Sequence, residues 1–340
     1  MTDFEILTDF GNLYRSYLIS LHRLRNKTQA DCFCLIALEY LLVMKNELID
    51  RTYRVGAYHE FTVTEPKIRQ VMAGTFRDKV LQHCLCDYVL LPKMAGVFLR
   101  NNFAGQLGKG TLFGLDTLSE HLRSYDREHV NAGYILKCDI SKFFYSIPHD
   151  TMKRVLREYF DDEGILWICD RLIDSTPDPG LPLGNQCSQV FALILLHGLD
   201  IFITEELGCL YYGRYMDDFY LLSDDREYLK KCLCAIREYL SGLGLSLNGK
   251  TQIVPMSKGI RFLGFHTYLT DSGMVIRKLL GEKKREEKKR LLRMSKLVKT
   301  GKLSREKFEE HYASWRNHVS HGNCYKLLQN MDAYKESLFL

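Results

Sequence analysis

The chain has 340 residues, of which 46% are hydrophobic and 26% are charged, and its formal net charge is +5. This composition excludes a disordered or collagen-like chain, and the length predicts a globular protein with two or three subdomains. The N-terminal stretch MTDFEILTDFGNLYRSYL carries acids and lacks the layout of a signal peptide. We expect no apolar run as long as a membrane span, and therefore a cytoplasmic protein without a membrane partner.

The chain begins with predicted helices, which a strand pair follows. Residues 1–55 form an N-terminal helical extension in this prediction, because the stretch 32–49 is apolar around most of its circumference. Residues 58–76 alternate in polarity and predict strands around Pro66. A helix over 77–91 that stops before Pro92, a basic loop with many glycines over 100–114 and a helix over 116–129 complete the segment 56–132.

The middle of the chain predicts alternating strands and helices. A strongly apolar strand over 133–140 contains Asp139 at its end, and the predicted helices are 149–160, 189–207 and 226–244, with a turn-rich loop over 176–184. Residues 245–256 and 260–276 predict further strands, and the chain beyond residue 280 predicts basic helices. This alternation favours an α+β fold in which helices cover one face of a sheet.

Eleven cysteines are a high count for a chain of this kind. Three pairs have the Cys-x-Cys spacing, and none has the Cys-x-x-Cys spacing of many zinc sites. Residues i and i+2 of a helix face different sides, so such pairs are poor metal clamps. We expect reduced, mostly buried thiols, with a zinc site as the alternative.

The stretch GRYMDDFYLL, residues 213–222, places two adjacent aspartates between tyrosine-rich and apolar runs. The flanks predict strands, so Met216 and Asp217 form the tip of a hairpin, where aspartate is a favoured turn residue. Two carboxylates at a sheet edge are costly without a positive partner, and a divalent cation with oxygen ligands is the natural one. The alternative is a solvated Asp-Asp turn.

A third carboxylate, Asp139, lies at the end of the apolar strand in LKCDISKFFYSI. In a split β-α-β sheet this strand is a neighbour of the hairpin, which would bring Asp139 to Asp217 and Asp218. Three aspartates at strand ends can hold two Mg²⁺ ions, or Mn²⁺ in their place. One ion would activate a primer 3′-hydroxyl, and the other would bridge the phosphates of a nucleotide and stabilise the leaving pyrophosphate.

Basic side chains match these carboxylates. Lys67, Arg69 and Arg77 precede the apolar strand and can grip a triphosphate. Residues 277–302 hold twelve Lys or Arg against three Glu, a density that predicts contact with a phosphate backbone. The alternative is a solvated helix face with internal Glu–Lys pairs.

Seven stretches of the chain occur in the order found in reverse transcriptases. They are EPKIRQVMAGTFRDKVLQH, FAGQLGKGT, KCDISKFFYSI, GLPLGNQCSQVFALILL, RYMDDFYLL, LGLSLNGKTQI and RFLGF. Across most of its length the chain therefore resembles these RNA-directed DNA polymerases. The resemblance implies a right-hand polymerase with fingers over 56–132, a palm over 133–272 to which 151–185 adds finger and loop segments, and a basic helical thumb over 273–340. It also implies template RNA, an RNA/DNA duplex and deoxynucleotide triphosphates as partners.

The resemblance assigns roles around the aspartates. Asp139, Asp217 and Asp218 look like the metal-binding triad of the family, with the backbone of Ile140 as a further ligand. Lys250 looks like the family's candidate proton donor to pyrophosphate, and a surface lysine is the alternative.

The resemblance also assigns the surfaces for nucleotide and primer. Arg69 looks like the arginine that packs on the incoming nucleotide, and Leu183 with Gly184 lies in the loop over the nascent base pair. Phe144 looks like the aromatic gate against a ribose 2′-hydroxyl, with a core phenylalanine as the alternative. The remaining assignments are the primer grip, Phe262, Leu263 and Gly264, and the thumb lysines that would bind template and primer, Lys283, Lys284, Lys288 and Lys289.

One block departs from the common pattern of the family. Most reverse transcriptases carry Gln-Gly followed by Ser-Pro, whereas here Leu183 precedes Gly184 and Gln189 follows Ser188. This variant, with FAGQLGKGT, resembles the enzymes of diversity-generating retroelements, which copy a template RNA with errors at adenines and work with a small accessory protein. A standalone antiphage-defence or retron-type enzyme that uses its own structured noncoding RNA is one alternative. A catalytically inactive RNA-binding scaffold is another.

Overall fold

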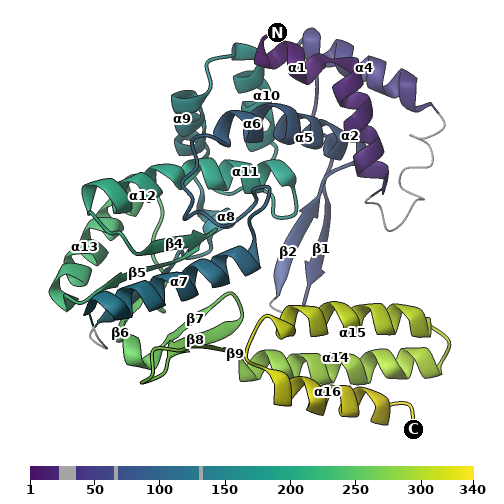
Figure 1. Cartoon of the computed structure of the whole chain (residues 1–340). Helices are drawn as coiled ribbons and strands as arrows, with labels where there is room; N and C mark the ends of the chain where they lie inside the picture. Colours follow the sequence, from purple (N-terminus) through teal and green to yellow (C-terminus); the bar gives the residue numbers. More distant parts are fainter. Residues whose placement is uncertain (23–35, 65–67, 130–132) are drawn as a thin grey trace.

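The computed structural model describes residues 1–22, 36–64, 68–129 and 133–340. Figure 1 shows a helical part above a sheet layer, and a separate group of C-terminal helices beside a two-stranded ribbon. The mixed α+β class that the sequence predicts is therefore confirmed.

The N-terminal helices are α1 (Asp3–Thr8), α2 (Phe10–His22) and α4 (Ala37–Ile49). A capping box between Thr2 and Glu5 starts the first of them. The ribbon that follows pairs β1 (His59–Val63) with β2 (Arg69–Ala73) in antiparallel register, as predicted. Lys67, the first of the predicted triphosphate contacts, lies outside the described residues.

The helix predicted to stop before Pro92 runs further. It consists of α5 (Phe76–Leu85), the π-helical turn η2 (Cys86–Leu90) and α6 (Leu91–Met94). Pro92 lies directly after the π-helical turn, and the helix continues through it although proline has no N–H to donate. The next helix, α7 (Thr111–His129), starts inside the predicted glycine loop rather than at Asp116.

A four-stranded antiparallel sheet forms the centre of the molecule. Its members are β3 (Tyr134–Asp139), β4 (Tyr212–Tyr215), β5 (Asp218–Ser223) and β6 (Gln252–Pro255), in the order β4-β5-β3-β6. This is the split β-α-β arrangement that the sequence predicts. The helices between the strands are α8 (Phe143–Ser146), α9 (His149–Tyr159), α10 (Glu163–Ile173), α11 (Gln186–Leu195), α12 (His197–Ile201), η3 (Phe202–Glu206) and α13 (Arg226–Gly242).

The expectation that no apolar run reaches the length of a membrane span is wrong. Within the described residues, the helical stretch Gln186–Glu206 is long and apolar enough by length and composition. It comprises α11, α12 and η3, and 72% of its apolar window is buried inside the protein. A core helix meets the same criteria, and α11 contributes Phe191, Leu193 and Leu195 to the main core.

Both outer strands of the four-stranded sheet are short, at four residues each. The segment before α7 lies along β4, where Phe103 N donates to Arg214 O at 2.9 Å and Arg214 N donates to Asn101 O at 2.9 Å. The ammonium of Lys109 folds back onto the carbonyls of Leu99 and Asn102, at 2.9 and 3.0 Å. On the opposite edge, β6 ends at Pro255, which has no N–H to donate.

The C-terminal part begins with the helical turn η4 (Met256–Lys258) and a second antiparallel sheet. Strands β7 (Ile260–Phe262), β8 (Phe265–Leu269) and β9 (Val275–Leu279) are paired in chain order. The helices α14 (Gly281–Lys299), α15 (Arg305–Ser320) and α16 (Tyr325–Ser337) follow and pack around Leu291, Phe308, Tyr312 and Met331. The predicted basic helices beyond residue 280 are confirmed.

Of the nine cysteines that the structure describes, eight are buried, Cys234 is exposed, and all are free thiols. Their predicted burial is therefore confirmed, whereas Cys32 and Cys34 lie outside the described residues. Burial raises the pKa of the Cys138 thiol to about 12, so this thiol stays protonated beside the aspartates.

Candidate active site

The predicted hairpin is present, and its tip is the two-residue turn Met216–Asp217. Tyr215 pairs with Asp218 across the turn, and Met216 has a positive φ of 55°. This backbone conformation is unusual for a side chain such as methionine and must be held by its surroundings.

A buried arginine holds the hairpin tip. Arg214 on β4 is fully buried and binds the carboxylate of Asp200 on α12 through Nε at 2.6 Å and Nη2 at 2.5 Å. Its Nη1 donates to the carbonyl of Met216 at 3.1 Å. Tyr212 also donates its hydroxyl to Asp200, at 2.6 Å. The position of Asp217 is thus tied to a helix in the main core.

The strand register brings the three aspartates together. Asp139 lies directly opposite Asp218 in the pairing of β3 with β5. Ile140 N donates to the carbonyl of Asp217 at 3.1 Å, which places the hairpin tip at the end of β3. Burial raises the pKa of Asp217 above its usual value, and the charge of Asp139 raises it further.

Two residues that sequence reasoning missed contact these carboxylates. The ammonium of Lys137, two residues before Asp139 on β3, contacts Asp218, and burial lowers its pKa to about 8. The amide Nδ2 of Asn248 donates to the side chain of Asp139, and its backbone N donates to the Asp139 carbonyl at 2.8 Å. The Asn-Gly pair in LGLSLNGK was a usable signal for Asn248.

The oxygen atoms at this site fit a divalent cation, although among the described residues no group of three His, Cys, Asp or Glu side chains is arranged to hold a metal. Lys137 takes an oxygen of Asp218 in this structure. Burial is the main cause of the raised pKa of Asp217, and the charge of Asp139 adds to it, so these two carboxylates lie close enough to interact. Ile140 and Leu247 form an isolated antiparallel β-bridge. Its two hydrogen bonds run from Ser141 N to Ser246 O and from Asn248 N to Asp139 O, so the Ile140 carbonyl takes no part in it. Carboxylates and a carbonyl are the ligands that Mg²⁺ and Mn²⁺ prefer.

Three of the predicted nucleotide-binding residues, Arg69, Phe144 and Leu183, can be followed from the aspartates outward. Burial raises the pKa of Asp217 and the positive charge of Arg69 on β2 opposes this shift, so Arg69 lies within electrostatic reach of Asp217. Phe144 is half-buried, with its ring 5.4 Å from the ring of Phe143. Its carbonyl accepts a hydrogen bond from Leu181 N at 2.7 Å, which joins α8 to the loop that carries Leu183.

Leu183 and Gly184 lie against β2 of the two-stranded ribbon. Met72 N on β2 donates to the carbonyl of Leu183 at 2.9 Å. Gly184 has a φ of 114°, and a Cβ there would lie 2.7 Å from Cγ1 of Val71. Glycine is therefore required both by the backbone conformation and by the close approach of the ribbon. The Leu183 loop is thus fixed to β2 through its backbone, and its contact with a nucleotide stays a prediction.

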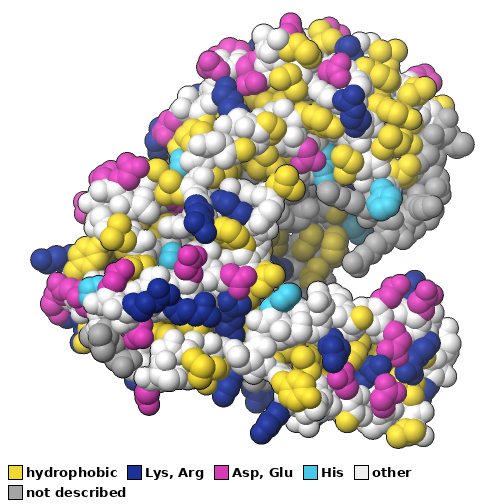
Figure 2. Space-filling view, in the orientation of Figure 1, with side chains coloured by type: hydrophobic (Ala, Val, Ile, Leu, Met, Phe, Trp, Pro, Cys, Tyr) yellow, Lys and Arg dark blue, Asp and Glu magenta, His cyan; other side chains and the backbone are white. Residues whose placement is uncertain are grey.

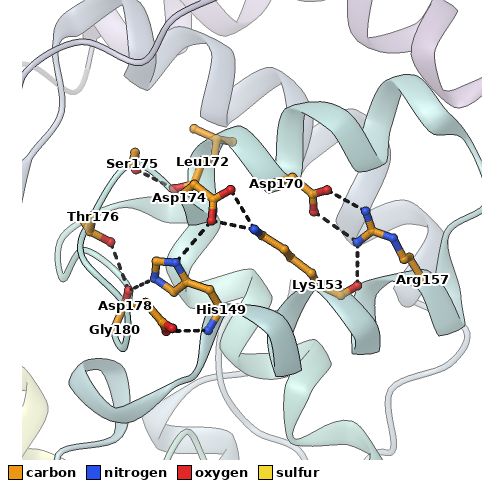
Figure 3. A network of polar contacts seen from close by, with 10 residues as sticks. All are labelled: His149, Lys153, Arg157, Asp170, Leu172, Asp174, Ser175, Thr176, Asp178 and Gly180. Carbon is orange, nitrogen blue, oxygen red and sulfur yellow. Dashed lines mark hydrogen bonds and ion pairs between the residues drawn. The ribbon is translucent and has the colours of Figure 1, made fainter.

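A polar network anchors the other end of this loop (Figure 3). The buried imidazole of His149, at the start of α9, lies 2.9 Å from the carbonyl of Gly180 and 3.3 Å from Asp174. Lys153 also binds Asp174, at 2.6 Å, and His149 N donates to Asp178 at 2.9 Å. The segment 174–184 is thus held by α9 at one end and by β2 at the other.

Two further predicted site residues, Arg77 and Lys250, contact groups other than the aspartates. Arg77 pairs with Glu47, and its guanidinium carbon lies 4.6 Å from the ring centre of Tyr53, so its grip on a triphosphate stays a prediction. Lys250 has an exposed side chain, and its backbone N donates to Asn248 Oδ1 at 2.6 Å. Its predicted role as a proton donor also remains untested by this geometry.

The family model described as "Reverse transcriptase (RNA-dependent DNA polymerase)" matches residues 67–267, more than half of the chain. The chain belongs to the reverse transcriptase family. The matched residues include all three aspartates, the loop that carries Leu183 and the four strands of the central sheet.

Solved structures support the same fold. The telomerase of Candida albicans in complex with a TWJ fragment of telomeric RNA superposes with a TM-score of 0.52 at 14% identity, covering 84% of this chain and 59% of that one. An apo telomerase of Candida tropicalis truncated from its C-terminal domain gives 0.50 at 13% identity, covering 68% and 59%. The chain thus spans about three-fifths of the length of these telomerases. The right-hand polymerase fold is confirmed, and the exact limits of fingers, palm and thumb remain predictions.

The predicted primer grip is the turn between β7 and β8. Phe262 is buried, with its ring centre 5.2 Å from the ammonium of Lys137 and 5.3 Å from the ring of Tyr220. Leu263 and Gly264 have positive φ values of 49° and 89° and line a cavity of about 610 Å³. The cavity also touches Thr64, which follows β1, and Lys283 and Trp315, so it lies between the β1–β2 ribbon and the helices α14 and α15.

The four predicted thumb lysines do not share one environment. Lys283 and Lys289 line the cavity beside the primer grip. Lys283 also pairs with Glu286 at 2.8 Å, so the internal Glu–Lys pairing considered from the sequence occurs as well. Lys288 lies over the ring of Tyr334 on α16 at 4.7 Å, and Lys284 is half-buried on α14. Figure 2 shows Lys, Arg, Asp and Glu side chains intermixed on the visible face of the thumb helices.

Proposed function

We propose that this chain synthesises DNA on an RNA template by nucleotidyl transfer. The observation that carries the proposal is the meeting of Asp139, Asp217 and Asp218 at the ends of β3 and β5, inside a match to the reverse transcriptase family. Mg²⁺ ions, when bound, would activate the primer hydroxyl and stabilise the leaving pyrophosphate. The Candida albicans telomerase was solved with RNA, which supports RNA as the template class here.

The protein's own groups have distinct parts in this proposal. The carboxylates of Asp139, Asp217 and Asp218 and the Ile140 carbonyl would hold the cations. Arg69, whose charge already reaches Asp217, neutralises the incoming triphosphate. Phe144 and Leu183 confine the sugar and the nascent base pair, and the turn at Leu263–Gly264 holds the primer end against the aspartates.

The proposal predicts separate effects on chemistry and on binding. Asp139→Asn and Asp217→Asn abolish primer extension, because each removes a metal ligand, and leave primer–template affinity near normal, because Lys and Arg supply most of it. Asp161→Asn removes an almost fully exposed carboxylate and is the matched control. Extension within tenfold of wild type in either active-site variant would refute the function, and the inactive-scaffold alternative predicts no extension even by wild type.

We further propose error-prone copying of a retroelement template RNA, which rests on Leu183. Glutamine at this position can hydrogen-bond near the nascent base pair, whereas leucine can only pack. A missing hydrogen bond of roughly 0.5 to 1.5 kcal/mol changes relative rates by about two- to twelvefold. A small accessory protein would be a partner in this case.

Leu183→Gln should therefore raise fidelity, mostly opposite template adenine, as measured by sequencing cDNA made by wild type and variant. The backbone hydrogen bond from Met72 N to the Leu183 carbonyl does not depend on the side chain, so the loop keeps its place in the variant. If wild type copies adenine as accurately as the other bases, the defence-type or retron-type alternative, with its own structured noncoding RNA, is favoured. An active variant with an unchanged error spectrum would remove Leu183 as the cause.

A further inference from the structure

Lys137 has a place that neither the family match nor the proposed mechanism explains. It lies on β3 two residues before Asp139, so both side chains project from the same face of the sheet. Register places Asp139 opposite Asp218 and Lys137 opposite Tyr220, which makes Lys137 the diagonal neighbour of Asp218. Its ammonium contacts Asp218, its side chain is only 17% exposed, and Phe262 lies beside it at 5.2 Å.

The charges at this position explain why a lysine is stable there. Asp139 and Asp218 are like charges directly across an antiparallel pair, an arrangement that destabilises a sheet. A half-buried pair of carboxylates also loses hydration, so an unpaired pair would be costly. The Lys137 ammonium offsets both effects without any bound ion. Its flexible four-carbon stem would also let it withdraw, which the planar group of an arginine permits less easily.

A divalent cation needs the same oxygen atoms. An ion that binds Oδ1 of Asp218 has to displace the Lys137 ammonium, and an ion held by the other carboxylate oxygens is repelled by the same positive charge. We propose that Lys137 is an internal counter-ion of the aspartate site and competes with a divalent cation for Asp218. The inference rests on the proposed metal site, and it makes Lys137 a positioning residue that sets how tightly the site binds metal before nucleic acid arrives.

Direct metal binding tests this inference. Mn²⁺ is titrated into the full-length, nucleic-acid-free protein and free Mn²⁺ is measured by electron paramagnetic resonance. Lys137→Met keeps the length of the side chain and removes the charge, and it should bind Mn²⁺ on the order of tenfold more tightly than wild type. Lys142→Met is the control, because it removes an exposed lysine three residues after Asp139, and it should change the affinity by no more than about twofold.

A second variant tests the contact itself. In wild type, Asp218→Asn should alter Mn²⁺ affinity little, because Lys137 already occupies that carboxylate. In the Lys137→Met background, Asp218→Asn should cost on the order of tenfold, because the freed carboxylate has become a ligand. Thermal unfolding gives a further readout: without metal Lys137→Met should melt below wild type, and saturating Mn²⁺ should raise its melting temperature more than that of wild type.

Equal or weaker Mn²⁺ binding by Lys137→Met overturns the inference, as does an equal effect of Asp218→Asn in both backgrounds. If Lys137→Met does not fold, the single variant Asp218→Asn still decides: a large loss of its Mn²⁺ affinity relative to wild type overturns the inference. Absence of Mn²⁺ binding in every variant also overturns it. Primer extension by wild type with Mg²⁺ is measured separately, so a failure of the proposed function is distinguishable from a failure of the counter-ion.

Discussion

At the scale of single residues, Phe144 has a sharp test. Its half-buried ring lies beside Phe143, and its neighbour Tyr145 donates its hydroxyl to Gln70 O at 2.9 Å. A ring under the sugar excludes a 2′-hydroxyl by contact, so Phe144→Ala should raise incorporation of ribonucleotides relative to deoxyribonucleotides by roughly tenfold, equivalent to about 1.4 kcal/mol. Single-nucleotide incorporation assays measure this ratio.

Tyr145→Phe is the control for Phe144→Ala, because it removes a neighbouring hydroxyl and should leave the ratio unchanged. If Phe144→Ala keeps full discrimination but lowers the free energy of unfolding by about 3 to 5 kcal/mol, Phe144 is a core residue.

The aspartates could be predicted from the sequence, whereas their partners could not. Asp139 and Asp217 stand out because acids interrupt apolar strands at their ends. Lys137 is a single lysine inside a strand, and the sequence does not show which carboxylate it faces. That depends on the register of β3 against β5, which places Lys137 diagonal to Asp218. Arg214 was missed for a similar reason, because its partner Asp200 lies on α12 rather than in the hairpin.

At the scale of elements, the buried pair between Arg214 and Asp200 joins the hairpin to α12. Asp200→Ala leaves the guanidinium buried without its carboxylate and should lower the free energy of unfolding by about 3 to 5 kcal/mol. Replacing both partners, with Arg214→Met in addition, should cost less than Asp200→Ala alone. Urea unfolding followed by circular dichroism measures these differences.

The exposed pair Arg154–Glu158 is the control for the buried pair, at 3.2 Å with both side chains more than half exposed. Glu158→Ala should change the free energy of unfolding by less than about 1 kcal/mol. A similar cost for Asp200→Ala would mean that water reaches the buried pair.

The contact between α7 and the four-stranded sheet should depend on pH. His121 on α7 lies with Nδ1 3.0 Å from the Tyr220 hydroxyl, and burial lowers its pKa from 6.5 to about 4. A depressed histidine pKa favours folding while the imidazole is neutral. This contribution is present above about pH 6.5, falls as the pH drops, and is fully lost below about pH 4. A shift of this size is worth up to about 3 kcal/mol.

His121→Gln removes this titration, so the stability of the variant should depend less on pH than that of wild type between pH 6.5 and 4. Chemical unfolding at a series of pH values is the measurement. Parallel curves for the two proteins would contradict the assignment.

Most elements follow from periodicity and turn residues, and the exceptions have physical causes. Helix α10 was missed, although Asp162 gives a helix-start signal and its side chain accepts from Gly164 N at 2.9 Å. The helix predicted over 189–207 is interrupted at Leu196, where ψ is 0°. The apolar residues around Leu196 are buried on all sides of the helix, so the hydrophobic pattern does not indicate where the helix is interrupted.

At the scale of the whole molecule, the lysines of α14 should differ in their effect on nucleic-acid binding. The double variant Lys283→Gln/Lys289→Gln removes two cations from the cavity beside the predicted primer grip. This pair should lower the slope of log affinity against log salt by roughly 0.7 to 0.9 for each phosphate that the thumb no longer neutralises. Fluorescence anisotropy with a primer–template duplex at several salt concentrations measures the slope.

Lys288→Gln is the charge-changing control, because Lys288 lies over Tyr334 rather than in the cavity, and it should leave the slope unchanged. An unchanged slope in the double variant would mean that these lysines belong to a solvated helix face and do not contact the duplex.

The pairing of β3 with the hairpin β4–β5 could be predicted, because the aspartates have to meet. The contact of residues 101–103 with β4 could not, because that segment has no alternating pattern and pairs through its backbone.

This contact has a consequence for behaviour in concentrated solution. An unpaired outer strand is a template on which another chain can add a strand, and this leads to aggregation and domain swapping. Here residues 101–103 already occupy the backbone groups of Arg214 on β4, with Lys109 bound to the same segment. On the other side, β6 has only four residues, the last of which is Pro255. Contact of residues 101–103 with β4 and the shortness of β6 therefore leave little free strand edge on this sheet for a second chain to pair with.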